Sequence, residues 1–412
     1  MNDRSYYTDS YTAEFSALVT EIYQDEQGSY VTLDKTYFYP TSGGQPFDTG
    51  TINDIPVTNV SVREQDGAIV HTLKGLPETK EISAVINWER RFDHMQQHTG
   101  QHILSQAFIQ LAGAQTVGFH LSEDTVTIDL DQETIEQSLI DEAEDLANEI
   151  VWQNRPVVVR WTTREGAETL QLRKIPQNGQ EKLRLIDILD FDLTACGGTH
   201  VARTGEVGLI KIRKTESRNK KTRIHFSCGR RALVHYRSLN TVVNELTSQL
   251  TTGTADLSAS VTKLQENEKE SRRALKSLQD QLEEREAQEL LQTGQKIGEN
   301  TLIVHLFTGE YNDQLRGIAG HLTREKGIIA LLGSVGERTH LLFTRSADAS
   351  GMMKELLQIT IKALGAGSGG GNAGFAQGSA PIDDFQAVQR ALEEAADALK
   401  QETTGTHSDD RP

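Results

Sequence analysis

Residues 1–90 alternate apolar and polar side chains in short runs. Segments 30–34 (YVTLD) and 82–86 (ISAVI) repeat with the period of two that is typical of strands with one buried face. Four of the eight prolines also lie in this part of the chain, as expected where turns separate short strands. The pattern predicts a small antiparallel β domain over residues 1–90.

Beyond Asp93 the apolar residues repeat at three- and four-residue steps instead. This spacing predicts one helix from Asp93 to a stop at Gly113 and a second helix over 132–153. Strand-like segments follow at 157–161, 183–188 and 208–213. The mixture predicts an α+β domain over residues 91–238.

No proline occurs between Pro176 and Pro381, and apolar residues continue at three- and four-residue steps from Leu239 to Leu282. We therefore predict long helices over 239 to about 292. A bend near Thr252-Gly253 would allow a helical hairpin. The apolar stripe breaks at 266–271, which argues against an uninterrupted coiled coil. Residues 239–297 are assigned to a helical linker.

Strands and helices alternate again in the C-terminal part. Apolar strands are predicted at 302–306, 328–332 and 341–343, and helices at 311–325, 351–363 and 383–400. This alternation predicts an α/β domain over 298–402. Residues 403–412 are polar and are predicted to form a disordered tail. The fold class that follows is a multi-domain α+β protein.

Composition indicates a soluble protein without a membrane partner. Mean hydropathy is −0.47, and the longest apolar run, 328–332, is far too short to cross a bilayer. The first residues lack the apolar segment of a secretory signal, so we expect a cytoplasmic protein. With only two cysteines, Cys196 and Cys228, a disulfide framework is implausible, and a reduced thiol that could bind metal is favoured.

The charge is unevenly distributed along the chain. A net charge of −17 argues against broad, non-specific binding of nucleic acid. Residues 201–240, however, hold eleven Lys or Arg and only two acidic residues. This basic window could hold a phosphate backbone, or it could be a solvated charged face, and composition alone does not decide between them.

Two pairs of candidate metal ligands stand out. His98 and His102 are four residues apart in a predicted helix, so both imidazoles lie on one face, one turn apart. Cys196 and His200 are separated by Gly-Gly-Thr. Each pair alone could be coincidence or core packing, but together the three nitrogens and one sulfur suit tetrahedral zinc. Four protein ligands are typical of a structural site, whereas catalysis needs an open or exchangeable position, and both interpretations stay open.

Two segments are rich in glycine. In 38–47, between predicted strands, the polar side chains could make contacts with a ligand, or the segment could be a plain hairpin turn. Residues 365–378 contain seven glycines and are predicted to form a loop between two helices. Backbone N–H groups of such a loop can hold phosphate, although no Gly-Lys-Ser/Thr follows as a Walker A motif requires. A flexible linker is the alternative, and we favour RNA contact over nucleotide binding.

These motifs together resemble the editing region of alanyl-tRNA synthetases and the free-standing AlaX editing proteins. The residues that carry the resemblance are His98-x3-His102, Cys196-x3-His200, TxFYPTSGGQP at 36–46 and the glycine-rich segment 365–378, in the family's order. The last segment is similar to the signature of the C-terminal DHH-associated (DHHA1) domain. The resemblance covers nearly the whole chain and leaves no room before residue 36 for an ATP-using activation domain. It implies the long AlaX type, with an N-terminal β-barrel, an editing domain, a helical linker and a DHHA1 domain.

The resemblance implies one Zn²⁺ per chain, bound by His98, His102, Cys196 and His200. The implied reaction is hydrolysis of the ester that links serine, or glycine, to alanine tRNA. Candidates for lining the pocket are Thr41, Ser42, Gln45, Thr99, Gln101 and His120. His120 lies in Gly-Phe-His-Leu, where synthetase editing sites usually carry a segment like Gln-x-Gly-Ser. It is either a substituted pocket residue or a strand-edge histidine.

The resemblance also implies contact with the acceptor stem of the tRNA. The candidate RNA contacts are Arg213, Lys214, Arg218, Lys220, Lys221, Arg223, Gly369, Gly370, Gly371 and Gln377. A homodimer through the helical linker or the DHHA1 domain is a further expectation. Three alternatives remain: an editing fragment of a split alanyl-tRNA synthetase, a non-catalytic tRNA-binding module with structural zinc, and a zinc hydrolase unrelated to tRNA.

Overall fold

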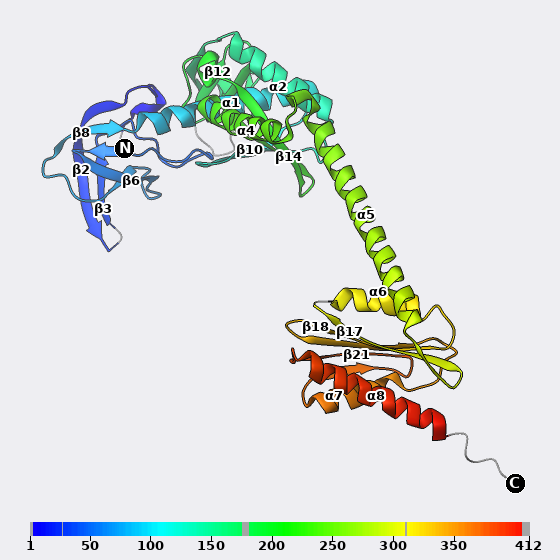
Figure 1. Cartoon of the computed structure of the whole chain (residues 1–412). Helices are drawn as coiled ribbons and strands as arrows, with labels where there is room; N and C mark the ends of the chain where they lie inside the picture. Colours follow the sequence, from blue (N-terminus) through cyan, green and yellow to red (C-terminus); the bar gives the residue numbers. More distant parts are fainter. Residues whose placement is uncertain (1–2, 27, 175–180, 310, 406–412) are drawn as a thin grey trace. The chain divides into compact units, whose positions relative to one another are not determined.

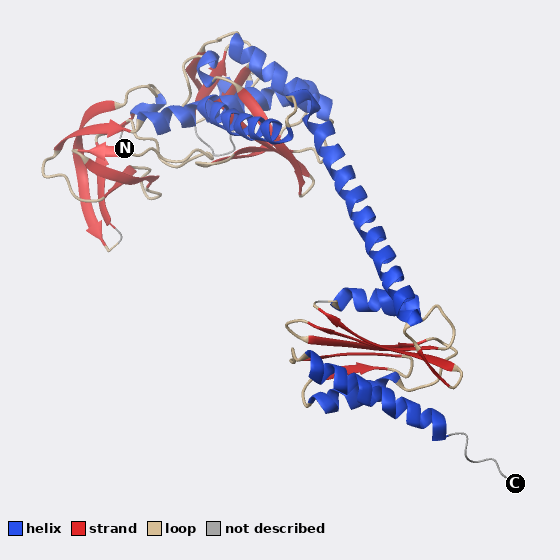
Figure 2. Ribbon diagram, in the orientation of Figure 1, coloured by secondary structure: helices blue, strands red, loops and turns tan. Residues whose placement is uncertain are grey.

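The structure is a computed structural model that describes residues 3–26, 28–174, 181–309 and 311–405. The chain divides into two units, 1–249 and 250–412. Both contain helices and sheets, so the protein is a multi-domain α+β protein, as predicted (Figures 1 and 2). No helix among the described residues carries an apolar stretch long enough to span a bilayer.

The N-terminal strands close into a six-stranded barrel in the order β2-β3-β7-β6-β5-β8. Their bounds are β2 (Glu14–Asp25), β3 (Gly28–Leu33), β5 (Gly50–Ile52), β6 (Ile55–Val62), β7 (Ile69–Leu73) and β8 (Glu81–Ile86). Strand β1 (Asp3–Arg4) and a short helix η1 (Ser5–Tyr7) precede β2, and β4 (Lys35–Thr36) follows β3. β1 and β4 pair in parallel. Alternate residues such as Val31, Leu33 and Ile69 fill the interior, because successive side chains of a strand point to opposite faces.

The barrel leads directly into a long helix, α1 (Trp88–Ala112). Asn87 caps its N-terminus by accepting a hydrogen bond from the Arg90 N–H, and Gly113, in the left-handed region, ends it. The helix begins five residues before the predicted start at Asp93. A core shared by α1, α2 (Gln137–Trp152) and a four-stranded sheet buries its apolar face.

That four-stranded sheet is antiparallel, in the order β14-β15-β10-β9. Its strands are β9 (Thr116–Leu121), β10 (Val126–Leu130), β14 (Ile210–Arg218) and β15 (Lys221–Cys228). A second, three-stranded sheet contains β11 (Val157–Thr163), β12 (Lys182–Ile188) and β13 (Asp192–Ala195). The remaining elements of this unit are α3 (Arg164–Glu168), η2 (Thr204–Val207) and α4 (Gly229–Leu250). The predictions missed β9, β10, β13 and β15.

The second unit begins at η3 (Thr254–Asp256) and α5 (Leu257–Gln292), so the helical region is interrupted close to the predicted bend. A six-stranded sheet follows in the order β16-β17-β18-β19-β21-β20, in which only β17 and β18 are parallel. Helices α7 and α8 cover one face of this sheet, and α6 with the end of α5 covers the other (Figure 1). The bounds are β16 (Gln295–Ile297), β17 (Asn300–Thr308), α6 (Asn312–Leu322), β18 (Ile328–Val335), β19 (Thr339–Arg345), α7 (Met353–Leu364), β20 (Ser368–Gly371), β21 (Phe375–Ala380) and α8 (Phe385–Gly405).

The prediction of a loop over 365–378 is wrong, because this segment forms the hairpin of β20 and β21. Gly369 is opposite Gly378, and a Cβ atom added at Gly369 would lie 2.7 Å from the Gln377 carbonyl oxygen. The glycines therefore allow β20 and β21 to approach each other closely. Helix α8 continues to Gly405, past the residue at which the polar tail was predicted to begin, and 406–412 lie outside the described residues.

Candidate metal centre

Helix α1 presents His98 and His102 toward the three-stranded sheet, and both side chains are buried. The other pair, Cys196 and His200, lies in the loop that follows β13. Arg184 of β12 fixes this loop by donating hydrogen bonds to the carbonyl oxygens of Cys196 (2.7 Å) and Gly198 (3.0 Å). The two pairs, about a hundred residues apart in sequence, are thereby brought to one place.

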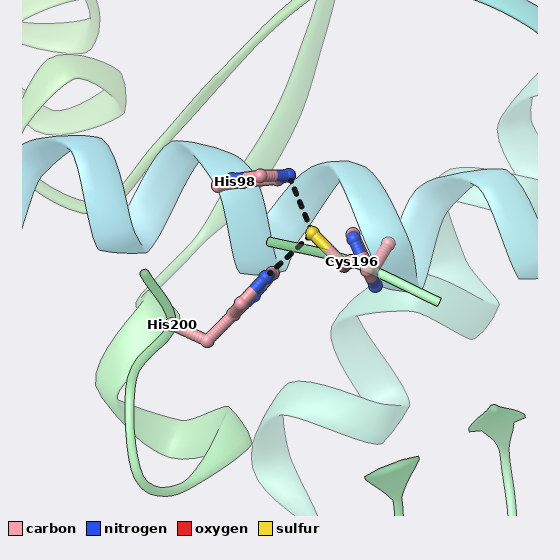
Figure 3. Close-up of side chains that lie close together, drawn as sticks. His98, Cys196 and His200 are labelled. Atoms are coloured by element: carbon pink, nitrogen blue, oxygen red, sulfur yellow. Dashed lines mark hydrogen bonds between the residues drawn. The ribbon is translucent and has the colours of Figure 1, made fainter. Parts of the chain in front are cut away.

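The four side chains form a single cluster, in which one ligand atom from each of His98, His102, Cys196 and His200 lies within 4.8 Å of all the others. Figure 3 shows His98, Cys196 and His200 pointing toward one another. Cys196 Sγ is 3.5 Å from His98 Nε2 and 3.4 Å from His200 Nε2. Three imidazole nitrogens and one sulfur at these separations fit a metal ion of the size and softness of zinc.

The Nδ1 atom of each imidazole in the cluster contacts a polar side chain. His98 Nδ1 donates to Gln45 Oε1 (2.8 Å), His200 Nδ1 contacts Thr99 Oγ1 (3.1 Å), and His102 Nδ1 lies 3.2 Å from Asp192 Oδ2. Because an amide oxygen only accepts, His98 keeps its proton on Nδ1 and turns an unprotonated Nε2 toward Cys196. Partners of this kind fix the tautomer and orientation of metal-binding histidines.

Electrostatics favour the ligand forms that a metal requires. Burial raises the pKa of the Cys196 thiol, but His98, His200 and His102 outweigh it, and the pKa lies well below its usual value. Burial lowers the pKa of His98 and, more strongly, that of His200. The cluster therefore favours a thiolate at Cys196 and neutral imidazoles at His98 and His200, which are the forms that coordinate metal.

His102 differs from the other two histidines. Burial lowers its pKa, but Asp192 and Cys196 outweigh burial and raise the pKa above its usual value. Asp192 in turn is held by Arg173, whose Nε is 2.8 Å from Asp192 Oδ1. The Arg173–Asp192–His102 series orients this ligand from outside the cluster.

A cavity of about 360 Å³ opens beside the cluster. His98, His102 and Cys196 form part of its wall, and Gln101 also lines it. The ring of Phe119, another wall residue, stacks on His98 with 5.2 Å between centroids. A metal held here would therefore border a space that a small substrate group can enter.

The other predicted pocket residues are distributed around this cavity. Gln101 is in the wall, whereas Gln45 and Thr99 are buried behind the ligands, where they bind His98 and His200. Thr41 and Ser42 are exposed, and only their neighbour Gly43 reaches the cavity.

His120 is exposed on β9 and is not among the wall residues. Asp192, Arg173 and Phe119 escaped the sequence analysis, because nothing in their local spacing marks them. Metal-bound histidines often donate their second ring N–H to a carboxylate, and this was the one signal that could have suggested a residue such as Asp192.

The basic candidates lie on the β14–β15 hairpin. Asn219 and Lys220, both with positive φ, form its turn, and Arg218, Lys220 and Lys221 are exposed there. Arg213 is exposed further along β14. Two of the six are already paired with acids: Lys214 with Glu216 (2.7 Å) and Arg223 with Asp129 (2.6 Å).

The glycine candidates, Gly369, Gly370 and Gly371, are exposed on the edge strand β20. Gln377 of β21 accepts a hydrogen bond of 2.7 Å from Arg316 of α6. Gly369, Gly370, Gln377 and Arg316 line a polar cavity of about 650 Å³.

Comparison with known proteins identifies the family. The model of the threonyl and alanyl tRNA synthetase second additional domain matches residues 183–225, and that of class II (A) tRNA synthetases matches residues 3–90. A solved structure of the C-Ala domain of Aquifex aeolicus alanyl-tRNA synthetase matches 26% of this chain and 95% of that chain at 28% identity. Its TM-score of 0.23 is too low for an argument about the fold.

Two relatives cover almost the entire chain. The alanine–tRNA ligase of Pyrococcus furiosus is 32% identical over 96% of this chain, which corresponds to 43% of the ligase. The alanyl-tRNA editing protein AlaX-L of Pyrococcus horikoshii is 33% identical over 97% of this chain and 100% of its own length. The chain belongs to the family of AlaX-L alanyl-tRNA editing proteins.

Proposed function

We propose that the chain is a zinc-dependent aminoacyl-tRNA deacylase that acts in trans and removes serine or glycine from mischarged alanine tRNA. The observation that carries this proposal is the convergence of His98, His102, Cys196 and His200 beside a cavity. A purely structural metal would need no such space. The full-length match to an alanyl-tRNA editing protein supports the same reaction.

The four clustered side chains would hold the zinc, with Gln45, Thr99 and Asp192 orienting the imidazoles. Bound Zn²⁺ supplies Lewis-acid polarisation of an ester carbonyl or of water, or anchors the amino acid end of the substrate. Gln101 would select serine, since its amide nitrogen donates to Ser105 Oγ (2.8 Å) and its amide oxygen is left for a hydroxyl of the substrate. Alanine and glycine have no such hydroxyl and would leave that oxygen unpaired, so this contact favours serine over both.

We assign the RNA contacts to two surfaces, one in each unit. In the first unit, exposed cations of the β14–β15 hairpin would bind phosphates. In the second, the glycine strand β20 and the polar cavity beside Gln377 would contact RNA, and residues 298–402 would form the DHHA1 domain. Cytoplasmic residence and homodimer formation remain predictions.

Metal analysis coupled to deacylation tests the central proposal. Purified chain should contain one zinc and hydrolyse Ser-tRNA(Ala) much faster than Ala-tRNA(Ala), without a synthetase. Cys196→Ala should lose zinc and activity together. Cys228→Ala is the matched control, because Cys228 is buried against α1, away from the cluster, and should keep both.

The same assay separates the alternatives. Activity that needs an added synthetase would favour the split-enzyme fragment, and tRNA binding without hydrolysis would favour a non-catalytic module. Hydrolysis of simple esters with no preference for tRNA would point to an unrelated hydrolase. Full activity of Cys196→Ala would remove the metal site from the reaction.

The hairpin assignment has its own test. Replacing Arg218, Lys220 and Lys221 by Ala should weaken tRNA binding and reduce the slope of log K against log salt by roughly 0.7–0.9 for each phosphate that the protein no longer neutralises. Lys211→Ala is the control, because Lys211 is already paired with Glu144 at 2.5 Å and should change the slope little. An unchanged slope in the triple variant would make the hairpin an ordinary solvated surface.

A further inference from the structure

A second cavity of the first unit, at the beginning of α1, is larger than the one beside the metal cluster. Its volume is about 1040 Å³, which matches the upper end of the usual range of small-molecule sites. Its walls consist of the N-terminal part of α1, the turn between β9 and β10, Arg213 of β14 and the beginning of α4. It shares no wall residue with the metal-site cavity, so the proposed hydrolysis does not account for it.

His94 lines this cavity with a ring nitrogen that lacks a partner. Only 1% of the side chain is exposed, and its Nδ1 atom is buried without a hydrogen bond to any described residue. Burial, together with the charges of Arg90 and Arg231, lowers the pKa of His94 from 6.5 to about 3. The ring is therefore neutral and offers one N–H donor and one acceptor. Buried polar atoms are rarely left unpaired, so this imidazole is suited to bind a ligand in the cavity.

An aromatic surface lies beside His94 in the same wall. The rings of Trp88 and Phe92, one turn apart on α1, have centroids 5.6 Å apart. Tyr11 contacts Trp88 at the same centroid distance. Although these neighbours hold the indole, it is still 37% exposed. A fixed and accessible aromatic ring is the type of surface on which unpaired nucleobases stack.

The cavity also offers a cation for a phosphate group. Four arginines line it, and three of them are paired with acidic residues of the same wall: Arg90 with Glu123, Arg230 with Glu89 and Arg231 with Asp93. The fourth, Arg213, is exposed and has no ion-pair partner within the described part of the chain. Burial and the charge of Arg213 lower the pKa of His235 of α4, which indicates that this guanidinium lies close to α4.

We propose that this cavity binds an unpaired nucleotide of an RNA strand, with the base on Trp88, the base edge on His94 and the phosphate on Arg213. Asp124, which is exposed in the β9–β10 turn and lines the cavity, would accept a hydrogen bond from the exocyclic amine of adenine or cytosine. A double helix does not fit this site, because its bases are already paired and stacked.

The position of Arg213 favours an RNA strand over a free nucleotide. Strand β14 leads from Arg213 to the exposed Arg218, about 17 Å further along. Phosphates next to the bound nucleotide would therefore meet the cations of the β14–β15 hairpin. The inference rests on the proposed function only for the identity of the RNA, alanine tRNA, because the cavity contains none of the candidate metal ligands.

Binding of a fluorescently labelled, single-stranded oligoadenylate to the full chain tests the aromatic contact. Trp88→Ala should weaken binding by roughly 5- to 150-fold, since it removes the stacking of one base. Trp152→Ala is the matched control, because Trp152 is 73% exposed on α2 and lines no part of this cavity, and it should bind like the wild type. A blunt RNA duplex should bind more weakly than the single strand. Unchanged affinity in Trp88→Ala overturns the proposal.

His94→Leu separates a ligand contact from a structural role. Leucine has a similar volume but no ring nitrogens, and no hydrogen bond to His94 Nδ1 is lost within the described residues. The melting temperature should therefore stay equal or rise. Oligoadenylate binding should weaken by roughly 2- to 10-fold. A fall in melting temperature together with unchanged binding would make His94 a structural residue and overturn its assignment.

Competition identifies the source of the bound group. AMP should displace the oligoadenylate only at a higher concentration than unlabelled oligoadenylate, and inorganic phosphate should be less effective than AMP. If AMP equals the oligonucleotide, the ligand is a free nucleotide, and if phosphate equals AMP, the site binds anions without recognising a base. Either result overturns the proposal.

The metal-site variant distinguishes this inference from the proposed reaction. Cys196→Ala should keep oligoadenylate binding, although we expect it to lose zinc and deacylation. Loss of binding in Cys196→Ala would place the strand at the metal-site cavity and overturn the assignment to the α1–α4 cavity. Retained binding by a wild-type chain that shows no deacylation would refute the proposed reaction and leave the nucleotide site in place.

Discussion

At the scale of single residues, the candidate metal centre depends on the absence of one side chain. A Cβ atom at Gly198 would lie 2.2 Å from His98 Cε1 and 3.0 Å from Gln45 Oε1. Gly198→Ala should therefore displace His98 and its partner, and we expect zinc affinity to fall by about 10- to 100-fold. Competition with a chelator measures this.

Gly197→Ala provides the matched control for that substitution. Its Cβ would meet nothing closer than the Tyr7 hydroxyl at 3.5 Å, an ordinary contact. We expect zinc affinity near that of the wild type. Equal affinities of the Gly197 and Gly198 variants would show that the loop adapts and that close packing on His98 is unimportant.

A buried imidazole outside the metal cluster should make the barrel sensitive to acid. His71 Nδ1 donates to the Val31 carbonyl (3.2 Å) and Nε2 accepts from Thr36 Oγ1 (2.9 Å). Burial lowers the pKa of His71 from 6.5 to about 4. The unfolded chain therefore takes up a proton at a higher pH than the folded chain.

The sign of the pH effect follows from this lowered pKa. The stabilisation is complete above the unfolded pKa and is lost as the pH falls from 6.5 toward 4, by up to about 3 kcal/mol. His71→Gln can keep both hydrogen bonds without titrating. Denaturant unfolding measures the free energy of unfolding near neutral pH and near pH 4. This free energy should change less with pH in the variant than in the wild type, and an equal change would show that His71 does not cause the acid sensitivity.

At the scale of elements, α1 and β15 approach so closely that a glycine is required between them. A Cβ atom at Gly100 would lie 2.3 Å from Cys228 Sγ. Gly100→Ala should destabilise the fold by about 1–3 kcal/mol, although Ala favours helices. Adding Cys228→Ala removes the clashing sulfur, so the double variant should be more stable than Gly100→Ala alone. Urea unfolding gives the free energy of unfolding of the wild type, the two single variants and the double variant. If the effects of the two substitutions simply add, Gly100 and Cys228 are not in direct contact.

The sequence predicted elements well where one face of the element is buried. Helix α2 and strand β8 have such a face, and their period was visible. β9 was missed because its burial does not alternate, since part of the strand lines the cavity. β20 was missed because four exposed residues, three of them glycine, carry no apolar pattern.

The site divides in the same way between local and long-range features. The spacing of His98 and His102 reflects one helical turn, so the sequence could reveal that pair. Asp192 faces His102 only because β13 packs beside α1, a contact between distant segments that no local pattern encodes. Gln45 was singled out for a pocket wall, but the structure has it behind His98.

At the scale of the whole molecule, each unit has its own hydrophobic core. The first unit contains the barrel core and the core around α1, and these are connected by a buried ion pair between Arg91 and Asp48. The second unit has a core on each face of its sheet. Domains with separate cores unfold as separate cooperative units, so calorimetry of the full chain should show two transitions.

Zinc should stabilise only one of these two transitions. All four candidate ligands lie in the first unit, and a ligand present at about 100 times its Kd stabilises the folded state by about 2.7 kcal/mol. Adding zinc to the metal-free protein should therefore raise the transition temperature of the first unit and leave that of the second unchanged. Cys196→Ala should abolish the shift while both transitions persist. If zinc moved both transitions equally, the two units would have to unfold as one, and separate cores could not explain the stability of this chain.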